Sequence, residues 1–84
     1  MAQRNDSFDV KNLVEAIVLP LVENPQEVAV SERRKGSTVT VKLHVSQNDM
    51  GKVIGKQGRI AKSIRTVLKA YAAKEDMFVE LDIE

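Results

Sequence analysis

A short segment of the chain combines two glycines with a high density of positive charge. Residues 50–65 read MGKVIGKQGRIAKSIR and contain five Lys or Arg residues but no acid. Gly55 and Gly58 enclose Lys56 and Gln57, and glycine lets another backbone approach closely because it carries no Cβ atom. The free N–H groups and the dipole of a following helix favour negative charge at the same place. The segment therefore predicts a binding site for a phosphodiester backbone.

Charge is separated along the chain, although the formal net charge is only +1. Residues 50–74 contain seven basic residues and no acidic one, so the remainder contains six basic and twelve acidic residues. This separation indicates a local anion-binding face on an acidic body, and the alternative is an ordinary solvated helix face. Three cations that follow the loop could extend the positive surface beside it: Arg59, Lys62 and Arg65.

Length and composition bound the architecture. The 84 residues, without internal repeats or a linker-like stretch, suffice for one modest core, so we expect a flexible segment at 1–8 and a single domain at 9–84. The absence of cysteine excludes a disulfide framework and a thiolate metal site. The start of the chain does not resemble a signal peptide, and the longest apolar run, 16–22, is too short to span a bilayer. These features predict a cytoplasmic protein without membrane insertion.

Hydrophobic periodicity predicts one helix in the first quarter of the chain. Apolar residues in 10–22 recur at helical spacing, and Asp9 or Asp6 is available as a cap. Pro20 lies inside this pattern and should kink or shorten the helix, because proline has no N–H group to donate.

Three strands are expected. A short strand is predicted at 28–32, and a clearer one at 38–45, where Val and Leu alternate with polar residues. A closing strand is predicted around 79–83, where the alternating polar residues are acidic. This alternation turns one face of the sheet to the core and the other to water.

Two further helices should flank the glycine loop. Ser46 followed by Asp49 resembles a capping box at the start of a helix of barely two turns, which Gly55 ends. A longer helix restarts near Gly58, with apolar residues on one side and Lys or Arg on the other. The resulting order, α-β-β-α-α-β, predicts an α+β fold in which a three-stranded sheet packs against three helices.

The segment from Val53 to Ile64, VIGKQGRIAKSI, resembles the I-G-x-x-G-x-x-I-x-x-I core of the KH family, and the element order is similar to the type II arrangement of that family. The resemblance covers nearly the whole chain. It implies that the G-x-x-G loop clamps the backbone of about four nucleotides of single-stranded RNA. It also implies a post-transcriptional regulator or RNA chaperone that works as a homodimer or with a larger KH-containing partner of the KhpB, Jag or EloR type.

The positions that match the family motif indicate which residues of this chain bind RNA. The resemblance implies that part of the 38–45 strand flanks a groove for the bases, and that eleven residues contact RNA: Gly51, Lys52, Ile54, Gly55, Lys56, Gln57, Gly58, Arg59, Ile60, Lys62 and Arg65. Ile54 and Ile60 can serve both groove and core, whereas core packing is the simpler role for Ile64.

Base selectivity should be weak. The aromatic residues are only Phe8, Tyr71 and Phe78, so no interleaved stacking platform is visible. Tyr71 lies on the apolar stripe of a predicted helix, which favours a place in the core.

Other classes of protein fit the same residues less well. A P-loop needs four residues between its first glycine and Gly-Lys, whereas Gly51 and Gly55 enclose three. A helix-turn-helix protein would not need glycine at both ends of its turn. We expect no enzyme, metal or cofactor, because His44 is the only histidine and lies on the polar face of a strand. The open alternative is a protein-interaction module of KH fold with weak RNA affinity of its own.

Overall fold

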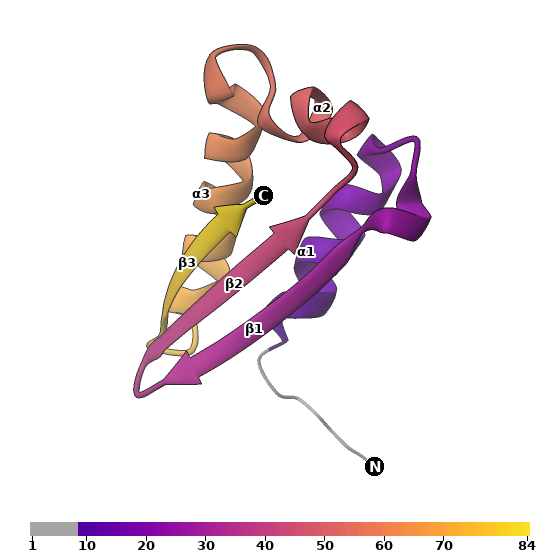
Figure 1. Ribbon diagram of the computed structural model, residues 1–84. Coiled ribbons are helices and arrows are strands. Elements are labelled where there is room, and N and C mark those ends of the chain that lie inside the picture. The colour runs from indigo at the N-terminus through magenta and orange to yellow at the C-terminus, as the bar shows by residue number, and fades with distance from the viewer. Residues whose placement is uncertain (1–8) are drawn as a thin grey trace.

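The computed structural model describes residues 9–84, so the predicted flexible segment 1–8, with Asp6 and Phe8, lies outside the described residues. This part of the chain forms three α-helices and one three-stranded sheet, joined by short 3₁₀ turns (Figure 1). The α+β class and the α-β-β-α-α-β order are therefore confirmed. The elements are α1 (Val10–Val18), η1 (Leu19–Leu21), η2 (Pro25–Glu27), β1 (Ala29–Lys35), β2 (Thr38–His44), η3 (Gln47–Asp49), α2 (Met50–Ile54), η4 (Lys56–Gly58), α3 (Arg59–Ala73) and β3 (Phe78–Ile83).

The first helix is shorter than the apolar pattern that predicts it. The Asp9 carboxylate accepts a hydrogen bond from the Asn12 N–H at 3.1 Å and so caps α1. The α-helix ends at Val18, and Pro20 lies in the 3₁₀ turn η1, since proline cannot donate the next helical hydrogen bond. The predicted shortening at Pro20 is thus confirmed.

The sheet has the order β1-β2-β3, so β2 is the central strand. β1 and β2 are antiparallel and are joined by a two-residue turn, in which Gly36 has a φ of 59° that glycine adopts without steric cost. β2 and β3 are parallel, which requires the long connection through α2 and α3. The predicted strands are confirmed, although β1 extends to Lys35 rather than to residue 32.

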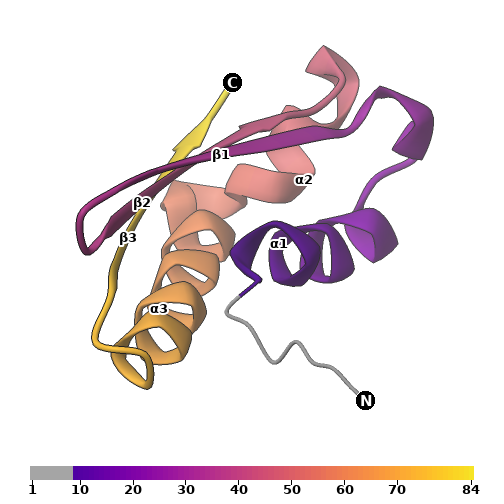
Figure 2. The same ribbon diagram turned by 90° about the horizontal axis from the view of Figure 1, so that it is seen from below.

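The helices pack on one face of the sheet. Figure 2 shows α1 and α3 side by side beneath the strands. Val39, Val41 and Leu43 of β2 are fully buried on this side, whereas Lys42 and His44 are exposed on the other. Most of the core is valine and leucine, and its burial stabilises the fold by about 25 cal/mol per Å² of apolar surface.

The predicted packing of Tyr71 on the apolar side of its helix is confirmed. Tyr71 is half-buried on α3, packs against the buried cluster, and its hydroxyl accepts a hydrogen bond from the Asp9 N–H at 3.1 Å. This bond ties the start of α1 to the second half of α3.

Among residues 9–84, none of the helices has the length and apolar character that spanning a membrane requires.

Candidate nucleic-acid interface

The glycine loop is a tight turn in which three of four residues have positive φ angles. α2 ends at Ile54, and Gly55 (φ 80°), Gln57 (φ 58°) and Gly58 (φ 74°) then turn the chain into α3, which begins at Arg59. A residue with a side chain rarely adopts such angles, because its Cβ atom crowds the backbone. The two glycines and the left-handed Gln57 therefore define the shape of the loop.

The surroundings of Gly55 and Gly58 differ in the space that they leave for a side chain. A Cβ atom on Gly55 would lie 2.7 Å from Cγ1 and 2.9 Å from the backbone nitrogen of Ile60, so Ile60 already fills that space. A Cβ atom on Gly58 would meet nothing within 4 Å. The expectation that both glycines leave room for another backbone is therefore wrong for Gly55. Only Gly58 leaves such a space open.

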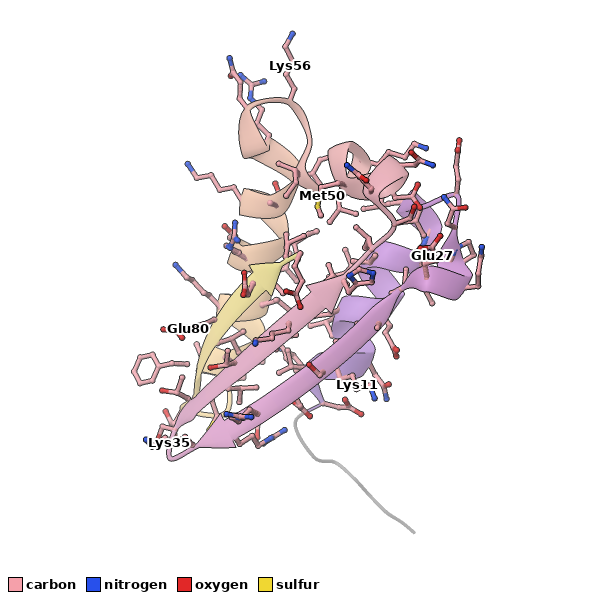
Figure 3. All side chains as sticks on the ribbon, viewed as in Figure 1. Lys11, Glu27, Lys35, Met50, Lys56 and Glu80 are labelled. Atoms are coloured by element: carbon pink, nitrogen blue, oxygen red, sulfur yellow. The ribbon has the colours of Figure 1, made fainter. Side chains whose placement is uncertain are left out.

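Positive charge is concentrated at the tip of the loop. Figure 3 shows Lys56 pointing away from the body of the protein at one end of the molecule, far from Lys35 at the β1–β2 turn. Arg59 donates a hydrogen bond from Nη2 to Oε1 of Gln57 at 3.4 Å, which leaves the Gln57 amide nitrogen as a donor. Within residues 9–84, no side chain caps the start of α3. The loop therefore combines two cations with the positive end of a 15-residue helix.

The basic side of α3 lies along the free edge of β3. Lys62, Arg65 and Lys69 are exposed and follow each other at intervals of three and four residues, so they share one flank of the helix. Arg65 donates from Nη2 to the Leu81 carbonyl oxygen at 3.1 Å. An open depression of about 240 Å³ separates α3 from β3 here and is lined by Arg65, Leu68, Lys69, Val79, Glu80 and Leu81.

Part of the 38–45 strand is expected to flank the groove, and this strand forms β2, whose two edges pair with β1 and β3. Its inward side chains are buried in the core. The strand beside the basic flank of α3 is β3, which is an edge strand of the sheet that residues 9–84 form.

Lys52, which the motif implies as an RNA contact, forms ion pairs within the protein. Its Nζ atom lies 3.1 Å from Oε2 of Glu23 and 3.6 Å from Oδ1 of Asp49. The hydrogen bond to Glu23, together with the charges of both carboxylates, raises the pKa of the Lys52 ammonium. Its positive charge is thus partly neutralised within the protein, unlike that of Lys56.

Asp49 fixes the short helix to the segment after α1, which corrects the predicted capping box. Oγ of Ser46 does accept a hydrogen bond from the Asn48 N–H at 3.3 Å. The fully buried Asp49 carboxylate instead accepts from the backbone N–H groups of Glu23 at 3.0 Å and Asn24 at 2.9 Å, and from the Asn24 side-chain amide at 3.2 Å. The bond from Glu23 is the main cause that holds the pKa of Asp49 below its ordinary value, and burial opposes this shift.

The apolar residues of the motif divide between core and surface. Ile64 is 3% exposed and belongs to the core, as predicted. Ile54 and Ile60 are half-buried, and Ile60 packs against the core, which leaves part of each available to a ligand. Gly51 is exposed on α2, where a Cβ atom would meet nothing within 4 Å.

Lys69 lies on the same flank as Lys62 and Arg65, as helical spacing predicts. One feature of the site is missing from the sequence prediction. Asp49 anchors α2 to Glu23 and Asn24, which precede it by 26 and 25 positions. No local signal in the sequence predicts a contact over that separation.

Comparison with known proteins adds an independent line of evidence. The family model described as KhpA/KhpB, KH domain, matches residues 11–83. A protein of Clostridium perfringens named RNA-binding protein KhpA is 53% identical over 74 residues, which cover 88% of this chain and 99% of that protein. Its namesake in Listeria monocytogenes serovar 1/2a is 46% identical over 74 residues, with coverages of 88% and 97%. No solved structure gives a significant match. The chain therefore belongs to the KhpA/KhpB family of KH domains.

Proposed function

We propose that this chain binds single-stranded RNA by clamping its sugar-phosphate backbone at the G-x-x-G loop with low base specificity. The observation that supports this most strongly is the geometry of the loop. Positive φ angles at Gly55, Gln57 and Gly58 present Lys56 to solvent beside the uncapped start of α3. The relatives named RNA-binding protein KhpA support the same function.

The loop supplies the groups that phosphate oxygens need. The dipole of α3 adds favourable charge at the start of the helix, where the Arg59 N–H already donates to the Lys56 carbonyl oxygen. Lys56 and Arg59 would contribute mobile positive charge, and the Gln57 amide a further donor. The open space at Gly58 allows the RNA backbone to approach the chain closely.

Bases would lie on the flanks of the loop. Gly51 and Ile54 of α2, and Ile60 and Lys62 of α3, would form this surface, which Arg65 extends toward β3. Isoleucine side chains provide apolar contact but no directional hydrogen bonds, so they discriminate poorly between bases. Phosphate contacts then dominate the affinity. Because the phosphate group is the same in every nucleotide, the specificity for bases is low.

Charge reversal at the loop tests this function. We expect the double variant K56D/Q57D to lose binding of a fluorescent single-stranded RNA, because two carboxylates would face phosphate oxygens. K11D/Q26D makes the same changes at exposed positions outside the loop and is the matched control. Normal RNA affinity in a folded K56D/Q57D variant would contradict the proposed clamp.

A wider role follows from the same proposal. We treat residues 9–84 as one KH domain, because the helices and the sheet share one cluster of buried side chains. The names of the relatives support a binding role rather than an enzymatic one. We place the protein in the cytoplasm, as a post-transcriptional regulator or RNA chaperone.

A second surface supports association with another KH protein, either a second copy or a larger partner of the KhpB type. Leu21 and Val67 are 36% and 47% exposed, and they border an open apolar groove of about 420 Å³ between α1 and α3. The groove is lined by Leu13, Ile17, Leu21, Arg59, Ile60, Ser63, Ile64 and Val67. An exposed apolar surface of this kind marks an interaction site. It also favours the alternative function, a protein-interaction module with weak RNA affinity.

A further inference from the structure

Phe78, the first residue of β3, is 70% exposed and is the most exposed large hydrophobic residue within 9–84. Its backbone N–H donates to the Ser37 carbonyl oxygen at 2.8 Å, so the backbone that carries the ring is anchored in the sheet. An open, mostly apolar depression of about 450 Å³ lies beside it and is lined by Lys69, Ala73, Asp76, Met77, Phe78 and Val79. An exposed aromatic ring on an ordered strand can stack on another π face at little cost in side-chain order.

This depression adjoins the one beside Arg65. It shares Lys69 and Val79 with the depression beside Arg65, so the two form one path between α3 and β3. The path follows the basic flank of α3, on which Lys62 precedes Arg65. From Arg59 to Lys69 the helix covers about 15 Å at 1.5 Å per residue, so the basic flank connects the loop with this path.

Resting on the function proposed above, we propose that Phe78 stacks on a nucleobase of single-stranded RNA that continues from the loop along this path. Phe78 would then extend the binding site beyond the roughly four nucleotides that a G-x-x-G loop holds. Every base has a π face, so one aromatic ring adds affinity without base-specific readout.

The charges beside Phe78 favour a base over a phosphate at this end of the path. Asp76 and Glu80 line the two depressions and would repel phosphate oxygens. Lys69 is the basic residue that lines the same depression as Phe78, and it can contact the phosphate that precedes the stacked nucleotide. The path thus changes from a cationic surface near the loop to an aromatic surface with acidic neighbours.

Oligonucleotide length separates this contact from the loop. We expect Phe78→Ala to weaken binding of an eight-nucleotide single-stranded RNA by about fivefold to tenfold, and to leave binding of a four-nucleotide RNA unchanged. Phe78→Trp should retain or increase the affinity for the longer RNA, whereas Phe78→Leu, which keeps apolar area without a π face, should behave as Phe78→Ala. The salt dependence should stay the same, because no phosphate contact is lost.

Each contrary outcome has a distinct meaning. If the wild type binds the longer RNA and K56D/Q57D abolishes this, but Phe78→Ala does not weaken it, the stacking proposal is wrong and the loop proposal stands. Full affinity in Phe78→Leu would likewise overturn stacking, since the contact would be merely apolar. A change of mass by light scattering in Phe78→Ala would assign the ring to a protein contact instead. If wild-type protein binds neither RNA, both proposals fail.

Discussion

Ile60 occupies the space that a side chain at Gly55 would need, with its Cγ1 atom 2.7 Å and its backbone nitrogen 2.9 Å from the position of a Cβ atom. The first glycine of the loop is therefore required by packing inside the protein. Gly58 has a similar φ angle but open space around it. The same motif thus contains one glycine that is required by packing and one that has open space beside it.

Alanine substitutions should separate these roles. Gly55→Ala combines a backbone conformation that is nearly exclusive to glycine with a steric overlap, so we expect a loss of at least ~2 kcal/mol in the free energy of unfolding. Gly58→Ala adds only the strain of a left-handed residue, about 1 kcal/mol. Urea unfolding of both variants measures the difference. Equal stabilities would contradict the packing role of Ile60.

Asp49 should make stability depend on acid pH. Its pKa is lowered in the folded state, so its stabilising contribution is complete above the unfolded value of about 3.8 and is lost as the pH falls through the folded value. Asp49→Asn removes this charge and should destabilise the protein at neutral pH. The difference from wild type should shrink below about pH 4. Urea unfolding between neutral and acid pH provides the measurement, and a difference that is constant with pH would contradict this role.

Much of the fold follows from local sequence signals, whereas the contacts that shape the site do not. Alternation predicts β2, and Pro20 predicts the early end of α1, because each depends on residues close in sequence. Arg65 reaches the Leu81 carbonyl, 16 positions away, and this pairing depends on the parallel placement of β3. Spacing alone could not distinguish Arg65, which contacts the protein, from Lys56, which faces solvent.

Lys52 and Lys56 should differ in RNA binding although both lie in the motif. Lys52 is held by Glu23 and Asp49, so we expect Lys52→Gln to change RNA affinity less than twofold. Lys56→Gln removes an exposed cation and should weaken binding about fivefold at moderate salt. Fluorescence anisotropy with one single-stranded RNA compares the two variants. A larger effect at Lys52 would show that the ion pair opens on binding.

The apolar groove between α1 and α3 predicts self-association. Val67→Glu would bury a charge in the contact and should shift the mass measured by light scattering toward the monomer. Thr66→Glu introduces the same charge at the neighbouring exposed position, outside the residues that line the groove, and is the control. A monomeric wild type at high micromolar concentration, with no partner recovered from cell extract, would count against this interface.

The salt dependence of RNA binding tests the loop clamp most directly. If the loop and its neighbouring cations neutralise roughly two to four phosphates, the slope of log affinity against log salt should lie between about −1.4 and −2.8. Lys56→Gln should reduce its magnitude by about 0.7, whereas Lys11→Gln should leave it unchanged. A matched RNA duplex should bind more weakly, because a short loop follows a flexible strand more readily than a rigid helix. A slope near zero, or equal binding of the duplex, would contradict the clamp.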